Sequence, residues 1–279
     1  METTQQSIET DPLKKSPGEH VLNSIKVLTE LRHHSGLFLA SHNEVNTGYN
    51  KAWIRDNVYE AIGLEAVNPL LAIETYHALL DVLLKHEYKI DWAIKKKPKH
   101  TYQYIHARYH PETHEEFDEE WGNKQHDAVG LFLFKIGELH KKGYRVIRDD
   151  TDIRIVQKLA DYLEAIEYWQ NPDHGVWEMR EEVHASSVGA CVAGLQAVKG
   201  IVKVNAEAIE KGSKALNDLL PRESCTKEYD LAQLSLIFPF NIVNKEQAEM
   251  ILKNIAKLER EKGLIRHHDD YYYNNGKEA

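Results

Sequence analysis

Residues 151–169 read TDIRIVQKLADYLEAIEYW, and this stretch decides the class of fold that we expect. Its apolar side chains recur at spacings of three and four residues, as they do along one face of an α-helix. The residues that form this stripe are Ile155, Leu159, Tyr162, Leu163 and Ile166. The stretch therefore predicts an amphipathic helix with one buried face.

The same periodicity extends through the rest of the chain. Comparable stripes run through 19–32, 70–86, 128–141 and 245–259. Strand signals are weak, because the apolar runs 37–40 and 236–238 are short and no alternating pair flanks a tight turn. The sequence thus predicts an all-α protein of about seven to eight helices. We expect a disordered tail over 1–17 and a single domain over 18–279, since no Ser, Gly or Pro linker interrupts the chain.

The composition narrows the possible partners. The 279 residues are 42% hydrophobic and carry a formal net charge of −9, so a core is expected and a nucleic-acid surface is not. The basic cluster Lys95–Lys99 is predicted to be solvated surface. Residues 1–16 lack the apolar segment of a secretory signal, and no apolar run reaches the ~18 residues of a membrane span. These features, with only Cys191 and Cys225, favour a cytoplasmic protein.

Metal and cofactor sites are not expected. The chain has sixteen histidines, including the pairs His33–His34 and His267–His268, but it has no HExxH pattern. It also lacks a phosphate-binding loop, a dinucleotide fingerprint and a Ser/His/Asp order, which argues against acyl or phosphoryl transfer. We therefore predict hydrogen-bonded or surface histidines, with neither a metal nor a cofactor.

Polar loops that carry an acid run directly into apolar helices at four points. Their acids are Asp56, Asp127, Glu178 and Asp230, which are 71, 51 and 52 residues apart. If the chain between successive acids forms one long helix or two short ones, the four loops return to the same end of the molecule. The loops also carry Trp53, Arg55, Trp121, Gln125, Trp177 and Arg180. Together they favour a site for sugar chemistry.

Glu178 is the candidate for acid chemistry. It follows Trp177 in a loop that precedes a predicted helix, for which Ser186 or Ser187 is the expected N-cap. A carboxyl group desolvated by an indole can remain protonated near neutral pH, as a general acid for glycosidic cleavage requires. The alternative is structural: Trp177 anchors the loop and Glu178 favours the dipole of the following helix.

Two further loops present groups that suit a sugar. Arg55 and Asp56 can clamp vicinal hydroxyls, because the guanidinium donates and the carboxylate accepts hydrogen bonds. The alternative is a capping Asp56 beside a surface Arg55. Near the end of the chain, Arg266 begins a segment dense in histidine, aspartate and tyrosine, RHHDDYYYNN.

The motifs in this order resemble glycoside hydrolase family 15, the glucoamylase family, and the glucoamylase-like domain of phosphorylase kinase α and β subunits. The resemblance rests on AWIRDNVY at 52–59, on WGNKQHDA at 121–128, on Trp177–Glu178, on ASSVG at 185–189 and on LPR through KEYD over 220–230. It covers roughly residues 20–279. It implies an α/α toroid of the six-hairpin glycosidase type, with the active site in a funnel formed by loops at one end.

The resemblance also implies roles for individual residues. Glu178 corresponds to the general acid, Arg55 and Asp56 to the pair that grips the non-reducing glucose, and Arg266 to a ligand beside the scissile bond. Trp121 and Trp177 correspond to pocket walls. The expected substrate-binding set is completed by Trp53, Gln125, Asp127, Arg180 and Asp230. The family's general base lies beyond the RHHDDYYYNN segment. The chain therefore resembles an incomplete toroid, which we expect to be inactive alone.

Two functions follow from the resemblance. The first is an inverting α-glucosidase that acts on α-glucans or trehalose, with Glu178 as the general acid. The second is a non-catalytic glycan-sensing or regulatory module of the phosphorylase kinase type. A purely structural helical domain is a third possibility. The expected partners are an α-glucan or α-glucoside and a second chain or C-terminal segment that completes the toroid, and neither nucleic acid nor a membrane.

Overall fold

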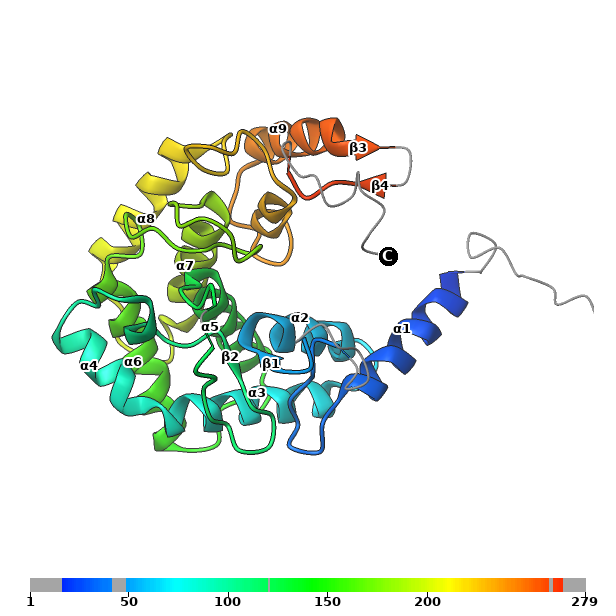
Figure 1. Ribbon diagram of the computed structural model, residues 1–279, viewed down its shortest axis with the longest axis vertical. Helices are drawn as coiled ribbons and strands as arrows, with labels where there is room; N and C mark the ends of the chain where they lie inside the picture. The colour runs from blue at the N-terminus through cyan, green and yellow to red at the C-terminus, as the bar shows by residue number, and fades with distance from the viewer. Residues whose placement is uncertain (1–16, 42–48, 120, 261–262, 268–279) are drawn as a thin grey trace, which may run out of the picture.

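The computed structural model describes residues 17–41, 49–119, 121–260 and 263–267 (Figure 1). This part contains nine α-helices: α1 (Pro17–Leu31), α2 (Ile54–Glu65), α3 (Pro69–Lys85), α4 (Glu87–Lys95), α5 (His126–Lys141), α6 (Asp150–Ile166), α7 (Ala185–Val198), α8 (Ala206–Leu219) and α9 (Lys245–Ile255). It also contains the 3₁₀ helices η2 (Thr101–Gln103), η3 (Leu231–Leu236) and η4 (Ala256–Leu258). The predicted all-α class is confirmed. The predicted tail falls almost wholly on residues 1–16, outside the described part.

The helices follow an arc with an inner and an outer layer (Figure 1). Helices α2, α5 and α7 lie on the inside of the arc, and α3, α6, α8 and α9 lie on its outside. Each inner helix is followed by an outer one, and the pairs α2–α3, α5–α6 and α7–α8 form helical hairpins. The inner helices also pack on one another, α2 on α5 and α5 on α7, and α7 packs on η3. This arrangement is the predicted α/α toroid, present as an open arc.

The inner helices are buried on several faces, which explains their composition. In α7, ASSVGACVAGLQAV, small and apolar residues occupy nearly every position, and twelve of the fourteen residues are buried. Helices α5 and α7 come so close that a Cβ on Gly130 would lie 2.4 Å from the carbonyl carbon of Ala190. A Cβ on Gly194 would likewise lie 2.4 Å from the oxygen of Gly130. Glycine at both positions therefore permits the close crossing.

Strands are minor elements. β1 (Ala52–Trp53) pairs antiparallel with β2 (Arg108–Tyr109), and β3 (Glu259–Arg260) pairs with β4 (Gly263–Leu264). The β1–β2 pair matters for function because it sets the start of α2 beside the segment that precedes α5. The apolar run 236–238 forms no strand, because it continues from the last residue of η3.

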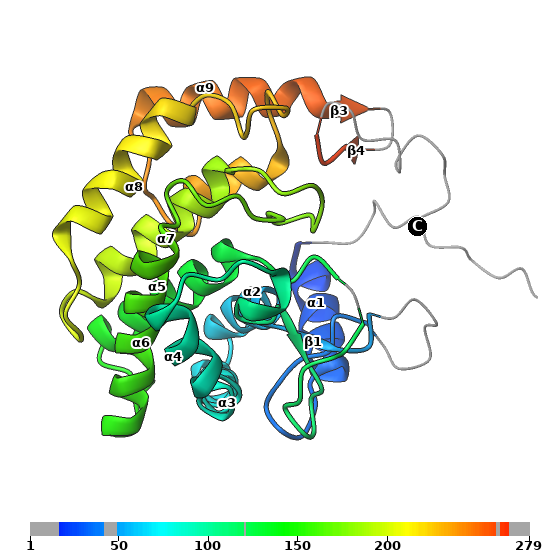
Figure 2. The ribbon, with the colours of Figure 1, turned by 60° about the vertical axis from the view of Figure 1, so that its left-hand side comes forward.

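One cluster of buried apolar side chains extends from Leu37 to Ile265 and joins the helices into a common core. Figure 2, turned from the first view, shows the loop between α6 and α7 reaching across the arc between α2 and α9. Within the described residues, no helix combines the length and apolar character that a membrane span would need.

Candidate active site

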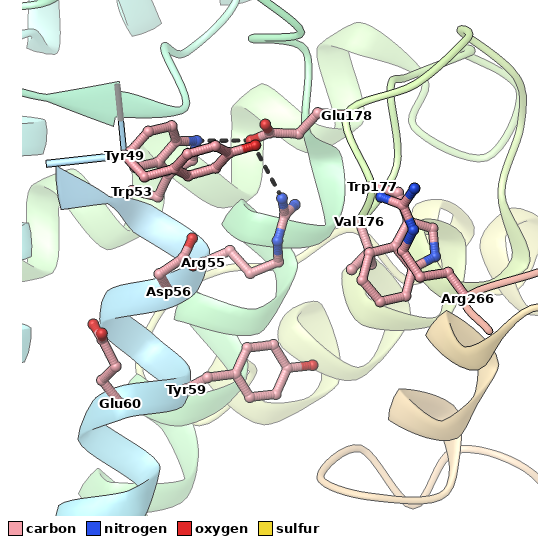
Figure 3. A pocket seen from close by; sticks show the side chains of 10 residues that line it. All are labelled: Tyr49, Trp53, Arg55, Asp56, Tyr59, Glu60, Val176, Trp177, Glu178 and Arg266. Atoms are coloured by element: carbon pink, nitrogen blue, oxygen red, sulfur yellow. Dashed lines mark hydrogen bonds and ion pairs between the residues drawn. The ribbon is translucent and has the colours of Figure 1, made fainter. Parts of the chain in front are cut away.

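A cavity of about 390 Å³ opens where the loops of the inner helices meet (Figure 3). This volume lies in the range of small-molecule sites. Ten residues line the cavity: Tyr49, Trp53, Arg55, Asp56, Tyr59, Glu60, Val176, Trp177, Glu178 and Arg266. On one side Asp56, Tyr59 and Glu60 project from α2, and on the other Val176, Trp177 and Arg266 form a second wall.

The four acid-bearing loops meet as the sequence predicted. Arg55 donates through Nη1 to both carboxylate oxygens of Asp127, at 3.2 and 2.9 Å. Trp177 donates from Nε1 to Asp230 Oδ1 at 2.6 Å. Glu178 links the two pairs, because it follows Trp177 in the chain and its Oε1 lies 3.5 Å from Nη2 of Arg55. The loop acids are thus connected by side chains that come from different helical hairpins.

The carboxylate of Glu178 accepts hydrogen bonds from three side chains on two segments. The indole Nε1 of Trp53 lies 2.7 Å from Oε1, the indole Nε1 of Trp121 lies 2.6 Å from Oε2, and Nε2 of Gln125 lies 2.8 Å from Oε1. The side chain of Glu178 is only 13% exposed. The loop turns sharply at this point, because Gly175 and Glu178 both adopt positive φ values, +63° and +55°. This turn directs the side chain of Glu178 toward its donors.

This environment corrects the expected role of the indoles. The sequence suggested that the ring of Trp177 would desolvate Glu178. Instead the N–H edges of Trp53 and Trp121 donate to the carboxylate, and Trp177 turns its own N–H to Asp230. Glu178 is therefore surrounded by hydrogen-bond donors from neighbouring loops, which sequence spacing alone could not show.

Arg55 and Asp56 occupy the first turn of α2 and both reach the cavity. Burial alone would lower the pKa of the Arg55 guanidinium, but Asp127, Asp56 and Glu178 outweigh it and raise that pKa. Burial raises the pKa of Asp56, and the neighbouring Arg55 opposes the rise. A fixed cation and a partly exposed carboxyl group therefore stand side by side, which suits adjacent hydroxyl groups of a ligand.

Four cavity residues were not anticipated, one of which is Val176, the residue before Trp177. Tyr59 and Glu60 lie three and four positions after Asp56, so the helical period of α2 could have placed them on the same face. Burial, with Asp56 nearby, raises the pKa of Glu60 to about 8, and burial raises that of Tyr59 to about 12. Tyr49 stacks on Trp53, with ring centroids 5.4 Å apart. It comes from a loop and carried no periodic signal.

The opposite wall is supported from the C-terminal side of the described chain. The guanidinium of Arg266 lies 5.6 Å from the centroid of the Trp177 ring. Asp230 is fully buried and caps η3, accepting from the N–H of Ala232 at 2.8 Å, while Lys227 Nζ lies 3.1 Å from its Oδ2. Asp230 therefore positions Trp177 without reaching the cavity.

A buried polar network lies beneath the Glu178 loop. Ser187 Oγ donates to Asp173 at 3.1 Å, and Ser186 Oγ donates to Glu223 at 2.5 Å. These serines lie inside the first turn of α7, whose N-cap is His184, so the predicted serine caps are wrong: their hydroxyls bond to distant carboxyl groups instead. Burial raises the pKa of Asp173 to about 7, while Glu223 and Asp173 overcome the effect of burial on His184 and raise its pKa to about 9.

The predicted site residues thus divide into three groups. Trp53, Arg55, Asp56, Trp177, Glu178 and Arg266 line the cavity. Trp121, Gln125, Asp127 and Asp230 lie behind it and bond to the lining side chains. Arg180 is exposed and lies outside the lining, because the chain turns away after Glu178.

The fold and the cavity define an α/α toroid of the glycosidase type. The chain belongs to the glycosyl hydrolases of family 15, whose family model matches residues 16–278. A glycosidase solved in its wild-type form superimposes with a TM-score of 0.76 at 21% identity, covering 91% of this chain and 73% of that one. The glucoamylase of Saccharomycopsis fibuligera gives a TM-score of 0.65 at 14% identity, covering 93% of this chain and 68% of the other.

Curated relatives point to a second branch of similarity. The liver-isoform phosphorylase b kinase regulatory subunit alpha of Mus musculus is 28% identical over 85% of this chain and 22% of its own length. A probable phosphorylase b kinase regulatory subunit alpha of Caenorhabditis elegans is 28% identical over 67% of this chain and 18% of its own. The chain therefore spans about a fifth of the length of these relatives.

Proposed function

We propose that the cavity binds the non-reducing end of an α-glucan or a related α-glucoside and that Glu178 protonates the glycosidic oxygen. The observation that carries the proposal is the Glu178 carboxyl group, fixed by Trp53, Trp121 and Gln125 at the edge of a cavity that also presents Arg55 and Asp56. Sugar hydroxyls both donate and accept hydrogen bonds, and this lining offers both kinds of partner.

The proposed chemistry is cleavage assisted by an acid, with Glu178 as the proton donor. The protonated carboxyl group gives its proton to the glycosidic oxygen, the bond from that oxygen to the anomeric carbon breaks, and the leaving sugar departs neutral. Glu178 is then a carboxylate, which the donors of Trp53, Trp121 and Gln125 stabilise. Water adds to the anomeric carbon from the opposite face and gives up a proton, which inverts the configuration.

Inverting hydrolysis needs a second carboxyl group about 6.5–9.5 Å from the first. Among the described residues, Asp56 and Glu60 are the other carboxyl groups that line the cavity. Burial, with Asp56 nearby, raises the pKa of Glu60 to about 8, so Glu60 is mostly protonated at neutral pH, and Asp56 stands beside Arg55 where a sugar would bind. We therefore propose that the base comes from outside the described residues, on a C-terminal segment or a second chain.

A second candidate is a glucan-binding module without turnover. Relatives that align with most of this chain are named regulatory subunits of phosphorylase b kinase. The same contacts with the sugar would then serve to sense it. The hydrogen-bond donors around Glu178 would hold its carboxylate in place, and the carboxylate would accept a hydrogen bond from a sugar hydroxyl. The two proposals share the binding site and differ only in bond cleavage.

The test combines binding with turnover. Calorimetric titration of maltose and trehalose gives the affinity, and an enzymatic glucose assay on the same samples gives the hydrolysis. Because the enzyme proposal places the base outside the described residues, both assays use the chain together with the C-terminal segment or second chain that supplies it. If the enzyme proposal holds, this assembly releases glucose, Glu178→Gln keeps the affinity and loses the release, and Glu181→Gln on the same loop keeps both. Binding without release by the unaltered assembly supports the module, and the absence of saturable binding contradicts both proposals.

A further inference from the structure

Two turns outside the sugar cavity bring together side chains that can bind a metal ion. The first turn follows α1 and carries His33 and His34, and the second follows β2 and carries Glu112. Glu112 Oε2 lies 2.8 Å from Nε2 of His34 and 3.5 Å from Nε2 of His33. All three ligand atoms lie within 4.8 Å of one another, and no other three His, Cys, Asp or Glu side chains of the described residues group so closely.

These separations fit a tetrahedral ion. Zinc binds imidazole nitrogen and carboxylate oxygen at about 2.0–2.2 Å, which puts its ligand atoms about 3.4 Å apart. The Glu112–His33 distance of 3.5 Å is close to that value, and the Glu112–His34 distance of 2.8 Å would widen by about 0.6 Å. His34 is 73% exposed, so its ring can turn into this geometry without disturbing the core.

Both turns are held by their own hydrogen bonds. The N–H of His33 donates to the oxygen of Leu37 at 2.7 Å, and the N–H of Gly36 donates to the oxygen of His33 at 3.0 Å. In the second turn, Nδ1 of His110 accepts from the N–H groups of Glu112 and Thr113, each at 3.2 Å. The backbones of the ligands are therefore positioned before any ion arrives.

A neighbouring hydroxyl can orient the half-buried ligand. Nδ1 of His33 lies 3.0 Å from Oγ of Ser35. In the tautomer with the proton on Nδ1, this nitrogen donates a hydrogen bond to Ser35 and leaves Nε2 free to bind an ion. The backbone N–H of Ser35 also lies 3.2 Å from Nδ1, a contact that requires the other tautomer. Metal binding would select the first arrangement.

We propose that His33, His34 and Glu112 bind a divalent transition-metal ion, with zinc as the best match, and that the ion links the turn after α1 to the turn after β2. Two imidazoles and one carboxylate suit zinc and exclude ions such as Mg²⁺ that prefer oxygen ligands. A water molecule completes the coordination. The site is structural, because none of its ligands lines the sugar cavity.

The link would connect two segments on which the first wall of the cavity depends. The N–H of Leu39, just after the first turn, donates to the oxygen of Leu31, and the N–H of Ala40 donates to the oxygen of Lys51. After the second turn, Glu116 pairs through its backbone with Tyr109 of β2, which in turn pairs with Ala52 of β1. An ion between the turns therefore stabilises the base of the Trp53 segment.

The experiment titrates Zn²⁺ into the full chain freed of any affinity tag, by calorimetry and by thermal unfolding. We expect Zn²⁺ to bind at one site formed by His33, His34 and Glu112, and Mg²⁺ not to bind there. Tm should rise by about 5 °C when the free Zn²⁺ concentration is 100 times Kd. Co²⁺ should give the visible absorption of a tetrahedral site.

Two exposed ligands supply the variants. His34→Ala and Glu112→Gln should each weaken that site more than about tenfold. His140→Ala, which removes an exposed histidine elsewhere, should bind as the unaltered chain does. The inference is overturned if Zn²⁺ does not bind, or if His34→Ala and Glu112→Gln bind it as tightly as His140→Ala. Both variants alter exposed side chains, and circular dichroism verifies that they fold.

Discussion

Replacing Asp127 by asparagine should destabilise the protein strongly, because it removes the negative charge of a buried ion pair and leaves the positive charge of Arg55 in place. The side chains of Arg55 and Asp127 are 8% and 6% exposed, and both oxygens of Asp127 accept from the same guanidinium nitrogen. In Asp127→Asn the cation stays buried, with Asp56 beside it and Glu178 at 3.5 Å as the remaining anions. Removing one partner of a buried pair costs about 3–5 kcal/mol.

The amide of asparagine keeps the shape and one acceptor, so we expect a loss near the lower limit, about 3 kcal/mol. For a chain of this size that corresponds to a fall in Tm of roughly 6–12 °C. Thermal unfolding followed by circular dichroism measures the change, and guanidinium unfolding checks it independently.

The matched control is an ion pair on the surface. Lys214 and Asp218 lie one turn apart on α8 with side chains 77% and 62% exposed, so Asp218→Asn should cost less than about 0.5 kcal/mol. The reasoning fails if Asp127→Asn loses no more stability than Asp218→Asn, because burial would then not govern the strength of the Arg55 pair.

Three further predictions concern packing, pH and the second wall. Gly130→Ala should lose about 3 kcal/mol of stability in chemical unfolding, because the new methyl group meets the backbone of α7, whereas Gly200→Ala, with open space around it, should change little. The free energy of unfolding should fall as pH rises from about 6.5 to about 9, since the folded protein holds the His184 proton more tightly than the unfolded chain does. Unfolding curves of His184→Asn should show a smaller fall, because the part due to Glu60, whose pKa burial raises to about 8, remains. Trp177→Phe removes the donor to Asp230 and should cost about 2 kcal/mol of stability and weaken maltose binding in calorimetry; unchanged values would show that the bond does not position the wall.

The fold class was predictable because most helices expose one face. The stripes at 151–169 and 70–86 mark α6 and α3, whose apolar sides face the core and whose other sides face water. Helix α7 shows no such stripe, since it is buried on nearly every side and its small residues serve close packing. The two-layer arrangement itself came from the resemblance, not from periodicity.

The site was predictable as a set of loops but not as a set of contacts. Regular spacing of the acids indicated that the four loops meet, and they do. Periodicity could not show that Glu178 accepts from Trp53, Trp121 and Gln125, because these donors come from different segments and depend on the packing of α2 against α5. It also could not exclude Arg180, whose exposure follows from the turn of the chain after Glu178.

The most direct test of the central claim is a crystal structure of the Glu178→Gln variant soaked with maltose. We predict the non-reducing glucose against Arg55 and Asp56, one face of the sugar near Trp177, and the glycosidic oxygen within about 3 Å of the substituted side chain. Maltose bound at another surface, or bound in the cavity with its glycosidic oxygen far from position 178, would contradict the account.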